Sequence, residues 1–177
     1  MKNTIIMKKA LLILMLICAS CAYGQRLSVL GIEMGSSYEN AEKILDIRFG
    51  NTNVARFPYK ELGLIKPRIG GYEWDVARFL FQSEVVKSTR HTCLSRFHAS
   101  KSFEDDMDEA KFFYQRWSEN LHAKYVCSRI EESEDGKTLT FWYTENEDIA
   151  LTLTLFHGEY FVQLDYFDNT IDESNDY

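Results

Sequence analysis

The sequence predicts an α+β fold of two helix-plus-antiparallel-sheet units in tandem, each with one helix packed on a meander of three or four strands. An amphipathic helix pattern at 103–123 and the alternating strands that follow it predict the second unit, and the first half repeats this order less regularly. We therefore expect units at 25–100 and 101–167. An export signal at 1–24 precedes them, and an acidic, disordered tail at 168–177 follows.

The helix of the second half is predicted from apolar residues at steps of three and four, which give a helix one buried face. These residues are Met107, Ala110, Tyr114, Trp117 and Leu121. Ser102 is the expected N-cap, with Asp105 as the acidic partner in a capping box. The acids at 104–109 could suggest a cation site, but the helix dipole favours negative charge at this end, so we expect no metal there.

The strands of the second half are predicted where the apolar period changes to two. Short turns with turn-forming residues, such as Asp135-Gly136, separate them. Parallel neighbours would need long crossovers, so these strands form an antiparallel meander. The predicted strands are 124–131, 138–144, 149–156 and 160–167.

The first half is predicted to begin with a strand at 27–34, followed by a helix that starts at the capping-box pair Ser36 and Glu39. This helix is expected to end near Arg48, with Gly50 as the stop signal. Residues 51–71 contain both prolines and are expected to be the least regular region, where a functional loop would lie. Strands are then expected at 54–59, 72–82 and 85–99. In the strand at 72–82 the apolar residues do not all point to one face, which predicts either a bulge or a strand covered on both faces.

Residues 1–24 have the features of an export signal. Three lysines precede an unbroken apolar run at 10–17, and small residues at Ala22 and Gly24 suit cleavage before Gln25. The apolar run is too short to span a bilayer. We therefore expect a protein of the periplasm or the medium. The alternative is a lipobox-like reading of Cys18-Ala19-Ser20-Cys21, in which a lipidated Cys21 would tether the protein to a membrane.

The charge of the chain argues against two classes of partner. Without residues 1–24, which carry three lysines and no acids, 17 Lys and Arg face 27 Asp and Glu, a net charge of −10. Nucleic acids and anionic lipid surfaces require a basic patch that this sequence does not contain. We expect no nucleic acid partner, and membrane contact only through a lipidated Cys21.

Two cysteines outside the signal, Cys93 and Cys127, have two interpretations. An even number in an exported protein suggests a disulfide that would join the two units. Alternatively they are buried thiols, or Cys93 pairs with His91 in a small hydrolase, because residues two apart on a strand share a face. The remaining histidines lack metal-ligand spacing, and no nucleotide- or phosphate-binding motif occurs, so we expect no cofactor.

The aromatic residues exceed what one face of a sheet needs for packing. We select Trp74, Trp142, Tyr143 and Tyr160 as candidate binding residues. Trp142 in particular lies among threonines on the strand face opposite that of Phe141. A sheet face rich in aromatics is typical of a protein-binding surface. The alternative is that the other half, or a second copy in a homo-oligomer, covers this face.

The segment Gly31-Ile32-Glu33-Met34-Gly35-Ser36-Ser37-Tyr38-Glu39-Asn40-Ala41 resembles the start of a unit in the beta-lactamase-inhibitor-protein-like (BLIP-like) families. These include small outer-membrane assembly lipoproteins and exported proteins of Bacteroides-type bacteria. The resemblance covers about residues 31–100 by motif, and the second half lacks the Gly-Ser opening. It implies a helix packed on an antiparallel sheet and protein binding without catalysis, and it assigns no functional residue.

Our first hypothesis is an exported, non-enzymatic module that binds a protein or peptide in the bacterial envelope. The alternatives are a Cys/His-dependent hydrolase that uses Cys93, and a lipid-anchored structural component of the envelope.

The two interpretations of the export signal predict different products. Cleavage before Gln25 removes Cys21, so we expect cells fed radiolabelled palmitate to yield unlabelled protein. Label that is incorporated by the unmodified chain and lost in Cys21→Ala would instead establish the lipid-anchored form.

Overall fold

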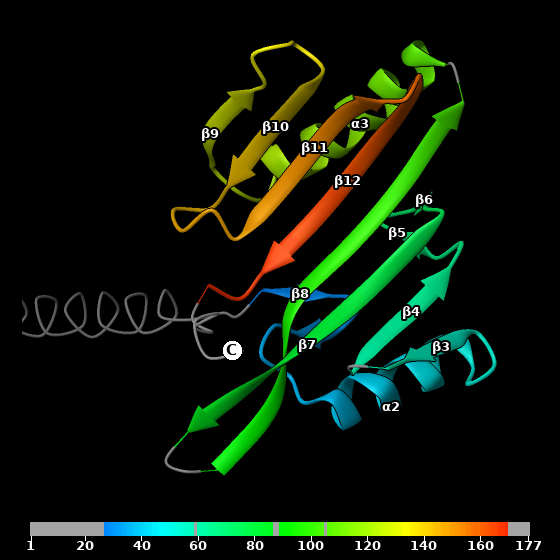
Figure 1. The fold of residues 1–177 in the computed structure, drawn as a ribbon, viewed down its shortest axis with the longest axis vertical. Helices are drawn as coiled ribbons and strands as arrows, with labels where there is room; N and C mark the ends of the chain where they lie inside the picture. The colour runs from blue at the N-terminus through cyan, green and yellow to red at the C-terminus, as the bar shows by residue number, and fades with distance from the viewer. Residues whose placement is uncertain (1–26, 59, 87–88, 105, 170–177) are drawn as a thin grey trace, which may run out of the picture.

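The computed structural model describes residues 27–169, except residues 59, 87–88 and 105 and the side chains of 84–91. Its main feature is one antiparallel sheet of eight strands (Figure 1). In sheet order the strands are β3 (Val54–Phe57), β4 (Glu61–Ile65), β7 (Val76–Val86), β8 (Thr89–Glu104), β12 (Glu159–Phe167), β11 (Ile149–Phe156), β10 (Thr138–Tyr143) and β9 (Cys127–Glu132).

The predicted fold of two tandem helix-on-sheet units is wrong. The last strand of each half, β8 and β12, pair with each other from Glu104 opposite Glu159 to Arg96 opposite Phe167. This pairing joins all eight strands into one sheet, and β8 continues past the boundary expected at residue 100. The buried residues of both halves accordingly form one hydrophobic cluster.

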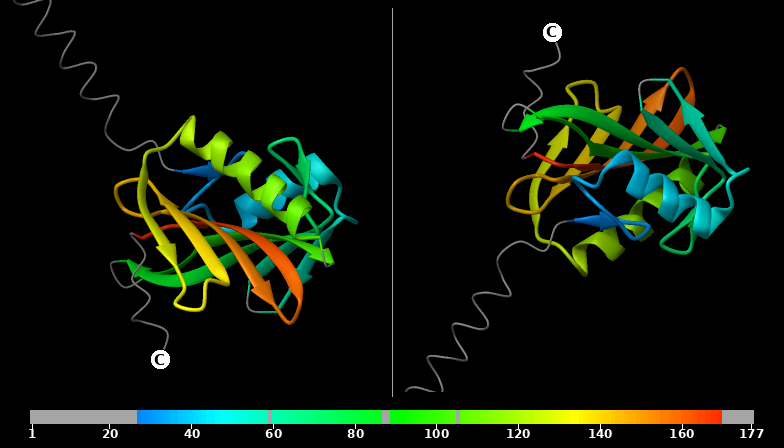
Figure 2. Two further views of the ribbon diagram at one scale, coloured as in Figure 1. Left: turned by 90° about the horizontal axis from the view of Figure 1, so that it is seen from above. Right: turned by 90° about the horizontal axis from the view of Figure 1, so that it is seen from below.

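Two helices, α2 (Tyr38–Phe49) and α3 (Met107–His122), lie on the same side of this sheet (Figure 2). The helix predicted after Ser36 is confirmed. Its N-cap is the next residue, Ser37, whose hydroxyl accepts a hydrogen bond from the Asn40 N–H at 3.3 Å. The helix ends at Gly50, which has a φ of 83° that a glycine adopts without strain.

The helix predicted for the second half is also confirmed, but its start is not at Ser102. Asp106 is the N-cap and accepts a hydrogen bond from the Glu109 N–H at 2.8 Å. Ser102 belongs to β8, where its N–H and its hydroxyl both donate to Asp75 Oδ2, at 2.7 and 2.9 Å. Because Ser102 is paired with Phe161 of β12 and the chain is extended in β8 up to Glu104, the N-cap of the helix lies four residues later.

The segment 51–71, expected to be the least regular region, contains more strand than the single one predicted at 54–59. It contains β3, β4 and β5 (Arg68–Ile69), which pairs with β6 (Tyr72–Glu73) in a small hairpin. The predicted strand at 27–34 is likewise a hairpin of two short strands, β1 (Ser28–Val29) and β2 (Ile32–Glu33). A bulge does occur in the pairing of β7 with β8, between Leu80 and Phe81.

Aromatic side chains from both halves fill the core beneath the helices. Trp74, which follows β6, is fully buried, and its ring lies 5.2 Å from the rings of both Phe113 and Trp117 on α3. Tyr114 fixes the same helix to the sheet, because its hydroxyl donates to the carbonyls of Leu139 and Leu151, each at 3.3 Å. Burial raises the pKa of Tyr114, which keeps this hydroxyl protonated as a donor.

The turn between β5 and β6 touches this core at Gly70. A Cβ atom at Gly70, where φ is 59°, would lie 2.8 Å from Trp117 Cη2, whereas a Cβ at Gly71, where φ is 88°, would meet nothing within 4 Å. Gly71→Ala therefore introduces backbone strain alone, which costs roughly 1–2 kcal/mol. We expect Gly70→Ala to lower the free energy of unfolding by about 1–3 kcal/mol more, because Trp117 must move.

Urea denaturation of the two variants checks this expectation. Equal destabilisation by both substitutions would contradict the close packing of this turn on Trp117.

Candidate functional site

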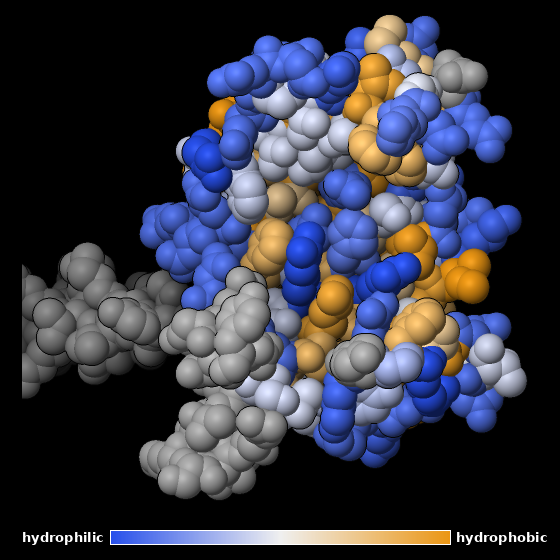
Figure 3. Space-filling view, in the orientation of Figure 1, coloured by the Kyte–Doolittle hydropathy of each residue, from blue (hydrophilic) through white to orange (hydrophobic). Residues whose placement is uncertain are grey.

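The candidate site lies on the face of the sheet turned away from the helices, which we call the open face. Along β12 the side chains of Val162, Leu164 and Tyr166 are buried beneath the helices. The alternate residues, including Asp165 and Phe167, therefore lie on the open face, together with the residues opposite them in neighbouring strands. Figure 3 views the molecule from this side and shows hydrophobic residues among hydrophilic ones.

Four planar side chains stack across the open face, and we call them the stacked ridge: Arg129, Trp142, Phe167 and Arg96. The rings of Trp142 and Phe167 are stacked with centroids 6.2 Å apart and an interplanar angle of 30°. Arg129 Cζ lies 5.0 Å from the Trp142 ring centroid, and Arg96 Cζ lies 5.1 Å from that of Phe167. Each arginine thus adds a cation–π contact at one end of the aromatic pair.

The strand register explains how these residues meet. Arg129 of β9 lies opposite Trp142 of β10, which lies opposite Ala150 of β11, and Phe167 of β12 lies opposite Arg96 of β8. Ala150 is buried and small, so the rings of Trp142 and Phe167 can approach each other above it. With the pairing of β11 and β12, the ridge therefore depends on four strand pairings and on a small residue at one position of β11.

Carboxylates hold both arginines in place. Arg129 donates from Nε and NH2 to Glu147 at 2.9 and 3.0 Å, and from NH1 to Glu131 at 2.9 Å. These partners raise the pKa of the Arg129 guanidinium, with the hydrogen bond to Glu147 as the main cause. Glu131 also accepts a hydrogen bond from Trp142 Nε1 at 3.2 Å, which fixes the indole.

Arg96 is fixed by Asp165, the one buried acid among the described residues. Arg96 NH2 lies 2.7 Å and Arg96 Nε 2.9 Å from Asp165 Oδ1, and His98 Nδ1 lies 2.9 Å from the same oxygen. The half-exposed guanidinium is thus held in one orientation against the Phe167 ring. Rotamers that are already fixed lose less entropy on binding.

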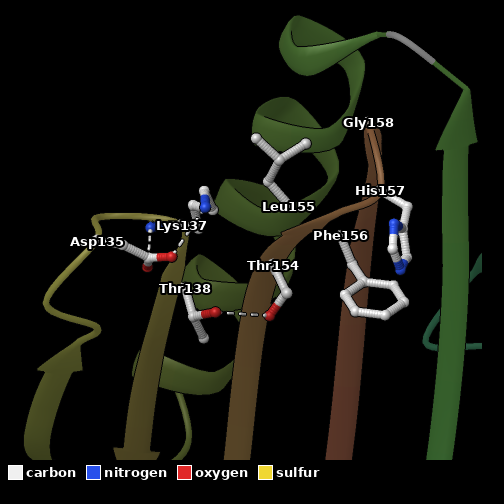
Figure 4. A pocket seen from close by; sticks show the side chains of 8 residues that line it. All are labelled: Asp135, Lys137, Thr138, Thr154, Leu155, Phe156, His157 and Gly158. Carbon is white, nitrogen blue, oxygen red and sulfur yellow. Dashed lines mark hydrogen bonds and ion pairs between the residues drawn. The ribbon is translucent and has the colours of Figure 1, made fainter.

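A hollow of about 530 Å³ lies further along β10 and β11 (Figure 4). Thr138 and Thr154 form its floor, and Phe156 and His157 lie on one side, with their rings 4.2 Å apart. Asp135 and its ion-pair partner Lys137, at 3.0 Å, lie on the other side. Hydrogen bonds from Ser133 and Lys137 lower the pKa of Asp135 to about 2, so this carboxyl is ionised at neutral pH.

Threonines connect the hollow with the stacked ridge, and we call Thr138, Thr140, Thr152 and Thr154 the threonine floor. The Oγ1 atoms of Thr140 and Thr152 lie 3.0 Å apart, and the Thr154 hydroxyl donates to Thr138 Oγ1 at 3.3 Å. Because the hydroxyls bond to one another across the strands, the floor is uncharged and internally hydrogen-bonded.

The structure places the four predicted binding residues in different environments. Trp142 is half-buried on the open face. Trp74 and Tyr143 are fully buried in the core, and Tyr160 packs against that core on the helix side. Trp142 and Tyr143 are consecutive in a strand, so they face opposite sides of the sheet. Of the four, Trp142 is therefore the one on the open face.

The arginines of the ridge and Phe156 were not predicted as site residues. Phe156 is 61% exposed. It follows Thr152 and Thr154 at steps of two along β11, and this spacing indicates that it shares their face, away from the core. Arg96 lies beside Phe167 because β8 pairs with β12, and the residue pattern within either strand does not predict that pairing.

The predicted disulfide between Cys93 and Cys127 does not form. Cys93 lies in β8 and Cys127 in β9, with β12, β11 and β10 between them. At ~4.8 Å per strand the two positions are roughly 19 Å apart across the sheet, beyond the ~7 Å limit on the Cα distance of a disulfide.

The candidate hydrolase is not supported by the position of its thiol. Cys93 is buried, and its Sγ lies 3.9 Å from the carbonyl oxygen of Gln82, to which it donates. The His91 side chain lies outside the described residues, as do Cys21 and the export signal. No group of three metal-ligating side chains occurs within the part of the chain that the structure describes.

In the described ranges, no helix is long and apolar enough to cross a membrane. Comparison of the chain with protein-family models, with curated proteins and with solved structures finds no match. The resemblance to the BLIP-like families therefore stays an expectation.

Proposed function

We propose that this protein is an exported, non-enzymatic module that binds a protein or peptide in the bacterial envelope through the open face of its sheet. The observation that carries the proposal is the stacked ridge. Tryptophan and arginine are the residues most enriched among those that dominate protein interfaces. Here Trp142 lies between Arg129 and Phe167, and its indole N–H donates to Glu131, so the orientation of the ring is held by three neighbours.

The environment of the ridge favours a protein over a carbohydrate. Arg129 and Phe167 contact the Trp142 ring from the strands on its two sides, β9 and β12. A sugar that stacks on an aromatic ring needs a free ring face. A protein partner can instead pack against the exposed edges of the rings and hydrogen-bond to the guanidinium groups.

The architecture also removes one explanation for the aromatic residues of the open face. Both halves contribute to the same sheet, and both helices cover its other side, so neither half covers the open face (Figure 2). Export is supported by the features of residues 1–24 alone.

Substitution of Trp142 tests the proposal. We expect Trp142→Ala to weaken binding by about 30-fold or more, because truncation of a central interface residue costs roughly 2 kcal/mol or more. The matched control is Phe112→Ala, which removes a 58% exposed aromatic from α3 on the helix side. Quantitative capture from the solubilised envelope, with the unmodified protein and both variants as baits, provides the measurement.

The result expected is a set of proteins lost with Trp142→Ala and retained with Phe112→Ala. Capture that is the same with all three baits would contradict binding at the ridge. A self-association that sedimentation detects and Trp142→Ala abolishes would replace the proposed partner with a second copy of this chain.

A further inference from the structure

We infer that the open face binds an extended, positively charged segment of its partner, which lies along β10 and β11. One apolar side chain of the segment would contact the stacked ridge, and a second would enter the hollow beside Phe156. This inference rests on the proposed function and adds the conformation and charge of the ligand.

Two apolar contact points lie at opposite ends of the same pair of strands. Trp142 is four residues from Thr138 along β10, and Ala150 is six residues from Phe156 along β11. At about 3.4 Å per residue these separations are roughly 14 and 20 Å. A ligand that reaches both contact points must therefore span four to six residues in an extended conformation.

The surface between the contact points suits an extended chain. The threonine floor is two strands wide, or about 10 Å, and the hollow has sides formed by Lys137 and Phe156 (Figure 4). A helix with its side chains is itself about 10–12 Å across, so it would rest above these sides. An extended chain places alternate side chains toward the floor and can enter the hollow.

The charges around this track favour a cationic ligand. Five acids and three Arg or Lys side chains border it, and the three bases already form ion pairs with four of those acids. The acids are Glu131, Asp135, Glu147, Glu159 and Asp165, and the bases are Arg96, Arg129 and Lys137. The whole chain carries 27 acidic against 20 basic residues, which steers cationic partners toward it and repels anionic ones.

Synthetic peptides test the inference directly. Each peptide has lysines at both ends, a Ser/Thr interior, and two phenylalanines separated by three, four or five residues. With three or five intervening residues both rings point to one side of an extended chain, and with four they point to opposite sides. A peptide of the same length and charge with one phenylalanine is the control, and fluorescence anisotropy gives Kd.

We expect at least one same-side peptide to bind at least 10-fold more tightly than both the opposite-side and the one-phenylalanine peptides. This gain should disappear with Trp142→Ala and with Phe156→Ala, and persist with Phe112→Ala. Replacement of the terminal lysines by glutamates should weaken binding, and added salt should reduce the difference between the two charge forms. Far-UV circular dichroism of the variants confirms that each is folded.

The outcomes separate this inference from the proposed function. Binding that depends on Trp142 but not on Phe156, or that does not vary with spacing, would overturn the extended segment and leave the ridge as the interface. Absence of peptide binding, combined with envelope capture that requires Trp142, would do the same. If Trp142→Ala changed neither peptide binding nor envelope capture, both the extended segment and the proposed function would be overturned.

Discussion

The pairing of β8 with β12 is the interaction on which the rest of the structure depends. It is the one contact through which the two halves share a sheet, with Ala99 opposite Leu164 near its middle. Without it each half would expose a long edge strand, and such edges pair readily with other chains. With it, the edges of the sheet are β3 and β9, both short and, in β9, rich in charge.

The open face follows from the same pairing. Both helices lie on one side of the sheet, so Trp74 and the aromatic residues of α3 pack there, and the helices leave the opposite side uncovered. The pairing also brings Arg96 beside Phe167 and Asp165, which completes the stacked ridge across β8, β12, β10 and β9. A surface suited to binding thus arises from residues far apart in the sequence, held by sheet register rather than by a loop.

Sequence periodicity located most of the local elements but not their assembly. The period of α3 and the alternation of β10, β11 and β12 located these elements correctly, because each pattern lies within one segment. The strand β4 was missed because it is short, contains Gly63 and lies between Pro58 and Pro67, residues that favour turns and loops. The alternation along 138–144 predicted which face Trp142 occupies. Its neighbours Arg129 and Phe167 depend on the register between separate strands, which no single segment encodes.

Native-state hydrogen exchange of the backbone amides in β8 and β12 tests most directly whether one sheet unites the chain. If the pairing joins both halves in one cooperative unit, these amides exchange only through global unfolding, with the same free energy as the core amides of β7 and β11. Exchange of the β8–β12 amides at a lower free energy, with different values for the two halves, would contradict the single sheet and the surface built on it.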